Sequence, residues 1–179
     1  NRNKLIGKKY SLSPFIQSDI TEEYIGWLND PEVNRYLCVR HVKQTLETVA
    51  KYIDDFYKNS EKYIWGVYSI EDKLIGTVNL VNINHYDNNA ALGLMIGNSD
   101  YWGKSASNEA ISLVLGFAFS TLELNRVTTN CTSTNIGMAF TFKQLGFVRE
   151  GVTRNGCIEN NKYIDNYQWG ILSDEWKNG

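Results

Sequence analysis

The chain has little of what several large protein classes require. Its 179 residues include only two prolines, three cysteines and two histidines. Cys38, Cys131 and Cys157 share no short spacing, and none has the C-x-x-C or histidine-bracketed arrangement of a zinc site, so the sequence contains neither a zinc motif nor a disulfide framework. We therefore predict free thiols, no metal site and a reducing, cytoplasmic environment.

Long apolar runs and an excess of one charge are also missing. The most apolar stretch, Ile111 to Phe119, is interrupted by Ser112 and Gly116 and is far shorter than the roughly 20 residues that span a bilayer. Asn1 to Lys9 contain no apolar segment typical of a secretory signal. Lys and Arg are interleaved with Asp and Glu at a net charge of −2, so no basic stripe is available for nucleic acid. We expect a cytoplasmic protein that binds neither nucleic acid nor a membrane.

Apolar residues are abundant instead, at 42% of the chain, which is enough for one substantial core. We predict a single domain over residues 1–179 with a mixed α/β (α+β) fold. Its central sheet is expected to be partly parallel, with about seven strands flanked by four helices. The expected strands lie around Tyr10 and Leu12 and over Tyr63–Ile70, Leu74–Asn84, Ala90–Ile96, Arg126–Cys131, Phe147–Arg154 and Tyr163–Leu172. The expected helices are one carrying Ile20 to Leu28, with Ser18 and Asp19 as caps, and Thr45–Tyr57, Asn108–Thr121 and Ile136–Leu145.

One predicted strand has an irregular polar pattern. Thr77 and Asn79 occupy odd positions, whereas Asn82 and Asn84 occupy even positions. The alternation of a strand therefore changes phase near Leu80, which predicts a bulge or a bend.

The stretch from Asp100 to Ala110 is the most informative part of the chain. Small residues connect a predicted strand directly to an apolar helix. A turn of this kind directs unpaired backbone N–H groups and the positive end of the helix dipole at one point, so it can hold an anion without a metal. It suggests a cofactor with a nucleotide tail.

Four segments, taken together in this order and spacing, resemble one protein family. They are Trp27–Val33, Tyr101–Lys104, Leu124–Val127 with Asn135, and Leu145–Gly151. The chain resembles the GNAT superfamily of acetyl-CoA-dependent N-acetyltransferases over nearly its whole length. It is most similar to the branch of ribosomal-protein N-terminal acetyltransferases and spermidine or diamine acetyltransferases.

This resemblance implies acetyl-CoA as the cofactor. The family pattern for the diphosphate loop falls on Trp102, Ser105 and Ser107, and every patterned position departs from it. Serine in place of the usual glycine adds a side chain where the backbone approaches the phosphates. Ser105 therefore either donates its hydroxyl to a phosphate or lowers the affinity for the cofactor. The residues expected to bind the cofactor through this loop are Trp102, Gly103, Lys104, Ser105, Ala106 and Ser107.

The resemblance also assigns the rest of the cofactor. The strand Leu94, Met95 and Ile96 is expected to splay from its neighbour and to pair with the pantetheine arm as an added strand would. Asn135 is expected to contact the same arm. Asn135 is also well placed to cap the helix that follows, and the two roles are compatible.

The implied reaction is transfer of the acetyl group to a primary amine by direct attack in a ternary complex. Many relatives use a Glu, a Tyr or a Ser at the positions held here by Ala91, Phe142 and Met138. Either other groups replace these residues or the chain has lost activity. The candidates are His85, whose ordinary pKa suits a base, with Asp87 beside it. Ser133 is a second candidate, with Thr134, because its hydroxyl could relay a proton through water. The alternatives are an exposed turn at His85 and a helix cap at Ser133.

The acceptor is left open by the residues. The loop from Glu32 to Gln44 shapes the acceptor pocket in this family, which makes Glu32, Tyr36 and Arg40 candidates for substrate binding. Arg40 suits a phosphate or a carboxylate, and Glu32 suits an amine. The mixed charge of this loop favours neither a polyamine nor a nucleotide sugar. A peptide terminus, a polyamine and an amino sugar all remain open as the acceptor, and a homodimer remains open as the assembly. The second hypothesis is a non-catalytic module of the same fold that binds CoA as a sensor or subunit.

Overall fold

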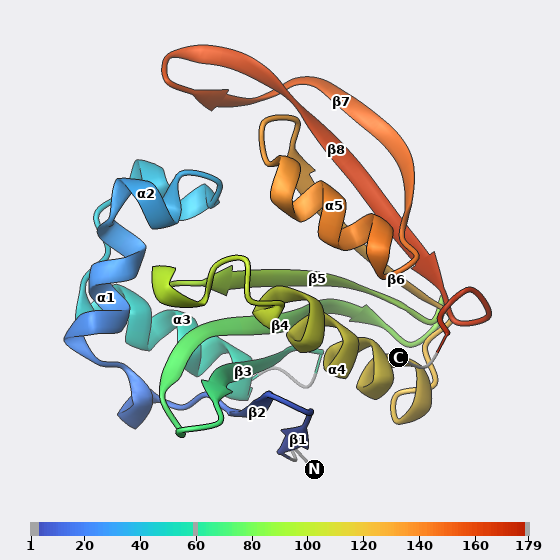
Figure 1. The fold of residues 1–179 in the computed structure, drawn as a ribbon, viewed down its shortest axis with the longest axis horizontal. Helices are drawn as coiled ribbons and strands as arrows, with labels where there is room; N and C mark the ends of the chain where they lie inside the picture. The colour runs from blue at the N-terminus through green and yellow to red at the C-terminus, as the bar shows by residue number, and fades with distance from the viewer. Residues whose placement is uncertain (1–3, 59–60, 178–179) are drawn as a thin grey trace.

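A computed structural model describes residues 4–58 and 61–177 of the chain. In this part of the chain eight strands form one sheet in the order β1-β2-β3-β4-β5-β6-β8-β7 (Figure 1). All neighbouring strands are antiparallel except β5 and β6, which are parallel. The sheet is thus partly parallel as expected, and the short β1 is the additional strand. The strands are β1 (Leu5–Ile6), β2 (Tyr10–Pro14), β3 (Tyr63–Ser69), β4 (Leu74–Asn84), β5 (Asn89–Ile96), β6 (Arg126–Thr132), β7 (Val148–Glu159) and β8 (Lys162–Leu172).

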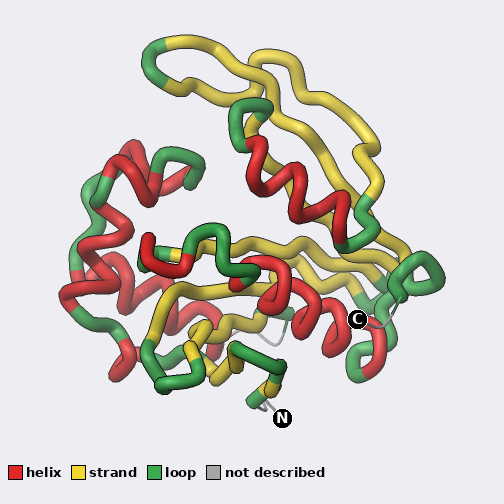
Figure 2. The backbone as a smooth tube through the Cα atoms, in the orientation of Figure 1, coloured by secondary structure: helices red, strands yellow, loops and turns green. Residues whose placement is uncertain are grey.

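Five helices accompany the sheet in the described residues (Figure 2). They are α1 (Glu22–Asn29), α2 (Pro31–Asn34), α3 (Leu46–Lys58), α4 (Ala106–Ser120) and α5 (Ile136–Gln144), with three short 3-10 turns, η1 (Gln17–Asp19), η2 (Cys38–His41) and η3 (Ser99–Tyr101). The unexpected helix is α2, a single turn. No helix within the described ranges is long and apolar enough to cross a membrane.

The start of α1 corrects the sequence-based expectation. Ser18 and Asp19 lie in η1, and the cap of α1 is Thr21, whose Oγ1 accepts the backbone N–H of Tyr24 at 3.1 Å. Asp30 then caps α2 by accepting the N–H of Glu32 at 2.8 Å. The chain therefore restarts a helix immediately after α1, because proline is tolerated at the first helical position.

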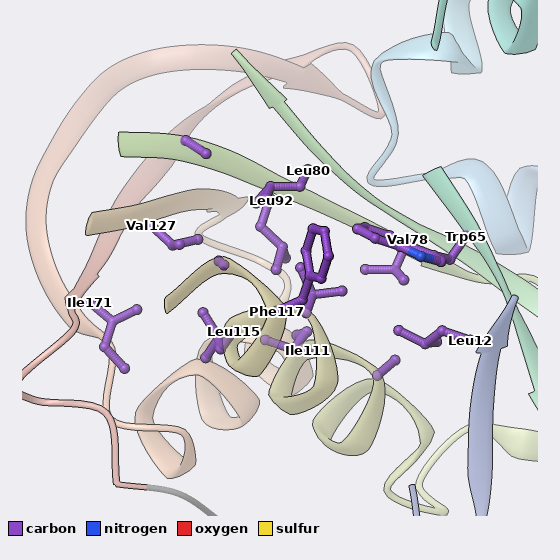
Figure 3. Close-up of a cluster of buried hydrophobic side chains, with 14 of the residues drawn as sticks. Leu12, Trp65, Val78, Leu80, Leu92, Ile111, Leu115, Phe117, Val127 and Ile171 are labelled. Carbon is purple, nitrogen blue, oxygen red and sulfur yellow. The ribbon is translucent and has the colours of Figure 1, made fainter. Parts of the chain in front are cut away.

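Apolar layers cover both faces of the sheet. On one face α4 presents Ile111 and Leu115, both fully buried, to the core, and Figure 3 shows these side chains pointing toward Leu80, Leu92 and Val127 of the strands. Burial of a side chain of this size stabilises the fold by about 1.5–3 kcal/mol. On the other face α1 and α3 pack over Phe15, Ile64 and Met95. The central strands are therefore held rigidly between two layers of helices.

The irregularity predicted in β4 is confirmed. The register between β4 and β5 shifts between Val81 and Asn84, and Asn82 has a left-handed backbone with φ +53°. Thr77 and Asn79 precede the bulge and lie on the face of the sheet that carries α1 and α3, whereas the residues after the bulge follow the opposite phase.

Candidate active site

The sheet opens between its two parallel strands. Register pairs join β5 and β6 only from Asn89–Ala91 to Arg126–Thr128, and Figure 1 shows the strands diverging beyond that point. A last link is the Thr129 hydroxyl, whose Oγ1 donates to the Leu92 carbonyl at 2.9 Å. The splay expected from the sequence is therefore present, and it leaves an unpaired strand edge inside the sheet.

The backbone of Leu94 faces this opening. The carbonyls of Leu92 and Ile96 both point to the β6 side, since one accepts from Thr129 and the other accepts the indole Nε1–H of Trp102 at 2.8 Å. Alternate residues of a strand direct their backbone groups to the same neighbour. The N–H and C=O of Leu94 are thus presented to the opening, whereas the carbonyl of Ile96 is already bonded.

A helix N-terminus lies at the open end, because the loop after β5 leads directly into α4. Gly103 and Ser105 have left-handed backbones, with φ +72° and +64°. The first intrahelical bond of α4 is the Glu109 N–H to the Ser105 carbonyl at 3.0 Å, so the N–H groups of residues 106–108 precede the helical bonding pattern. Together with the helix dipole they form a site suited to an anion.

Part of the predicted phosphate loop is used by the protein itself. The backbone N–H of Trp102 donates to the Ser99 carbonyl at 3.1 Å, and the N–H of Lys104 donates to the Tyr101 carbonyl at 3.3 Å. These turns hold the loop in shape. The anion site consequently includes fewer backbone donors than the predicted loop from Trp102 to Ser107. The donors that remain lie at the start of α4.

Asn135 and Ser133 lie at the same open end, because β6 runs parallel to β5. Asn135 caps α5, and its Oδ1 accepts the Met138 N–H at 3.2 Å. This cap leaves the Nδ2 donor of Asn135 for another partner. The backbone N–H of Ser133 donates to the Asp165 carbonyl at 2.9 Å, which holds the segment between β6 and α5.

A pocket of about 250 Å³ lies on the α1 and α3 face of the sheet and reaches the open edge of β5. Four of its polar residues form two pairs: the Tyr24 hydroxyl lies 3.3 Å from Thr77 Oγ1, and Asn79 Nδ2 donates to the Tyr52 hydroxyl at 3.3 Å. Burial raises the pKa of Tyr24, and it raises the pKa of Tyr52 to about 12, so both phenols are neutral at physiological pH. Among the described residues that line the pocket, none carries a charge. They are Tyr24, Leu28, Leu37, Cys38, Val39, Gln44, Val49, Tyr52, Thr77, Asn79, Gly93, Leu94 and Met95.

The predicted substrate residues lie beside this pocket and do not line it. Glu32 is exposed on α2. The Tyr36 hydroxyl donates to the Thr134 carbonyl at 3.4 Å. The Arg40 guanidinium donates to the Leu37 carbonyl at 2.6 Å and to the Ile158 carbonyl at 2.9 Å. Tyr36 and Arg40 therefore connect the segment after α1 to Thr134 and Ile158, which lie across the opening. The Arg40 guanidinium is thus bonded to backbone carbonyls.

The structure does not bring His85 to the opening. His85 is exposed on the turn between β4 and β5, and Asp87 on the same turn accepts from Asn84 Nδ2 at 2.8 Å. This turn lies where β5 begins, whereas Leu94 is five residues farther along the strand, a distance of roughly 17 Å at about 3.3 Å per residue. This position gives no support to the predicted catalytic role of His85.

The position held by tyrosine in many relatives is structural here. Phe142 is buried, and its ring lies 5.4 Å from that of Phe147 and 5.8 Å from that of Trp169. All three cysteines are free. Burial raises the pKa of the Cys131 thiol, so Cys131 is protonated and unreactive at neutral pH.

Sequence reasoning missed the polar residues of the pocket, although one signal was available. Thr77 and Asn79 were noted only because their phase differs from that of Asn82 and Asn84 on the same strand. The pattern predicted the bulge correctly, but it also marked two side chains that face a cavity. Tyr24 and Tyr52 had no distinguishing signal, because aromatic residues at helical spacing most often belong to a core.

Comparison with known proteins shows where this arrangement recurs. Residues 10–148 match the model of an acetyltransferase (GNAT) domain. An uncharacterised N-acetyltransferase, p20 of Bacillus licheniformis, is 26% identical over 151 residues, which cover 83% of this chain and 84% of that protein. The ribosomal protein uS5-alanine N-acetyltransferase of Escherichia coli is 23% identical over 129 residues, covering 71% of this chain and 66% of that protein. The solved structure of spermidine N-acetyltransferase from Vibrio cholerae in complex with CoA and spermine has a TM-score of 0.86 at 19% identity, covering 94% of this chain and 98% of that chain.

Proposed function

This chain belongs to the GNAT acetyltransferase family, and from that premise we propose which amine it acetylates and which of its residues perform the transfer. It is an N-acetyltransferase that uses acetyl-CoA. The comparisons give no support to the alternative of a non-catalytic CoA-binding module. The acceptor and the roles of individual residues form the proposal.

The residues at the opening fit the cofactor. The exposed edge of β5 offers the C=O of Leu94 for pairing with an amide N–H of a pantetheine arm. The start of α4 offers backbone N–H groups for a diphosphate, and the Nδ2 of Asn135, at the start of α5, is a further donor for the pantetheine arm. When bound, acetyl-CoA supplies an activated acetyl group whose thiolate leaving group has a pKa of about 8.5.

The transfer itself needs few protein groups. The pocket holds the amine beside Leu94, and holding two reactants together supplies a large part of the rate gain. The N–H of Leu94 is the donor placed to stabilise the oxyanion that develops during direct attack. A thiolate of ordinary pKa leaves without a strong acid and takes up the proton that the attacking amine releases, so the lack of a hydroxyl at Phe142 does not prevent the transfer.

We assign an α-amine of a peptide or amino-acid derivative as the acceptor. The pocket's described lining has no charge, so it offers nothing to neutralise a polyamine. An α-amine has a pKa of about 7.7–8.0 and an alkyl amine about 10.4. At pH 7.5 roughly a quarter or more of an α-amine is uncharged, against about one in a thousand for an alkyl amine. An active site without a carboxylate base favours the acceptor that loses its proton in water.

The experiment is to incubate the protein with acetyl-CoA and either alaninamide or spermidine, and to follow free thiol. We expect kcat/KM for alaninamide to exceed that for spermidine at least tenfold at pH 7.5. A preference for spermidine would reject the α-amine assignment. CoA binding without turnover of any amine above the hydrolysis background would reject catalysis by this chain.

The remaining expectations about partners belong to the same proposal. Cytoplasmic location, absence of a nucleic-acid or membrane partner, and a possible homodimer remain predictions from the sequence. Cell fractionation tests the location, and sedimentation equilibrium tests the assembly.

A further inference from the structure

Asn79 projects from β4, the strand that pairs with β5 on the side away from the opening. It pairs across the strands with Gly93, and the next pair on the same face is Val81 with Ala91. The Oδ1 atom of Asn79 is 2.8 Å from the point where a Cβ on Gly93 would lie. The carboxamide therefore occupies the space above Gly93, next to the backbone of Leu94.

In the structure Tyr52 pairs with the Nδ2 end of this carboxamide. Asn79 Nδ2 donates to the Tyr52 hydroxyl at 3.3 Å, which makes Oδ1 the end that is free to accept. Burial holds the pKa of Tyr52 at about 12, so this phenol does not ionise at physiological pH. No residue in the described part of the chain donates a hydrogen bond to Oδ1. The pocket thus contains one oriented acceptor without a partner, beside the site proposed for the thioester.

We infer that Asn79 is the specificity-determining residue of the acceptor pocket and that its Oδ1 accepts an N–H of the incoming amine. The inference rests on the acetyl transfer proposed above. A carboxamide orients an N–H but neither removes a proton nor neutralises a cation. Ala91, diagonal to Asn79 on the same face, provides no carboxylate either. The oriented amide explains how the pocket can position an α-amine and why it gives a polycation no advantage.

Two substitutions at this position separate the roles of orientation and charge. Asn79→Leu keeps the approximate volume and removes the acceptor, so kcat/KM for alaninamide should fall about 10- to 100-fold. Asn79→Asp adds a charge, so KM for spermidine should fall at least tenfold relative to KM for alaninamide. Asn82→Asp makes the same chemical change on the same strand at an exposed position, and it should leave the preference unchanged. Calorimetric CoA affinity should stay within about twofold in all three variants.

A binding measurement keeps this inference separate from the proposed function. Alaninamide is titrated into the CoA-bound protein while the side-chain amide signals of Asn79 and Asn82 are followed by NMR. A shift at Asn79 without a shift at Asn82 supports the inference even if turnover is absent, in which case the proposed catalysis is what fails. An active enzyme whose Asn79 signal does not move, or whose acceptor preference is the same in both Asn79 variants, overturns it.

Discussion

Ser105→Gly should stabilise the free protein. Ser105 adopts φ +64° and ψ +12° at the start of α4, a conformation that costs an L residue roughly 1–2 kcal/mol. Glycine adopts it without that cost but loses about 0.5–1 kcal/mol more conformational entropy on folding. The net gain is about 0–1.5 kcal/mol with a midpoint near 0.7 kcal/mol, which for a domain of this size is a rise in Tm of about 1–3 °C at the midpoint.

The same substitution decides what the Ser105 side chain does for CoA. Ser105→Ala is the matched control, because it keeps the backbone strain and removes only the hydroxyl. If the hydroxyl donates to a phosphate, both variants should bind CoA more weakly by a similar factor of about 5–10, while only the glycine variant gains stability. If the side chain instead obstructs the phosphates, Ser105→Gly should bind CoA more tightly than the natural protein.

The assays are scanning calorimetry of the free protein and isothermal titration with CoA. Gly103→Ala provides a reverse test, because Gly103 has φ +72° with open space around it, so only the backbone cost of about 1 kcal/mol should appear. A Tm of Ser105→Gly equal to or below that of the natural protein would refute the reasoning from backbone strain.

Three further outcomes are expected. His85→Asn should leave kcat/KM within twofold of the natural value in the thiol-release assay, because His85 is exposed and distant from the opening; a loss of tenfold or more would restore it as a base. Arg40→Ala should raise KM for the acceptor several-fold and leave the CoA affinity unchanged, since Arg40 holds the segment after α1 to the carbonyl of Ile158; a change confined to CoA binding would contradict this. The Arg126 guanidinium lowers the pKa of Glu150. Because the pair is partly exposed, it adds at most about 1 kcal/mol to the stability of the fold. This stabilisation is present above the unfolded pKa of about 4.3 and is lost as the pH falls through the lower folded pKa. At pH 7, urea unfolding should therefore show Glu150→Gln to be less stable than the natural protein, and this deficit should shrink as the pH is lowered below about 4.3. A deficit that does not change with pH would contradict the assignment.

The elements of the fold could be read from local patterns. The predicted strand Leu74–Asn84 and the observed β4 coincide, and the helix predicted over Ile136–Leu145 ends within one residue of α5. These elements have strong periodicity and well-defined ends, such as Gly146, whose φ is +92°. Short elements were missed because α2 depends on one cap and β1 depends on a partner strand, and neither produces a periodic signal.

The site was predictable only where it follows the chain. The anion site at the start of α4 and the opened β5 come from one continuous segment; its small residues predicted the anion site, and the family resemblance implied the opening of the strand. The roles of Arg40 and Tyr36 were harder, because their partners Ile158 and Thr134 lie about 100 residues away.

The sequence by itself determined the positions of the main helices and strands, the bulge in β4 and the loop that leads into α4, because each depends on residues a few positions apart. Only the tertiary structure decided that Tyr52 from α3 would orient Asn79 from β4 above Gly93 from β5. The side chain of Asn79 acquires these neighbours only when the three elements pack against one another. No local sequence pattern encodes contacts between residues so far apart in the chain.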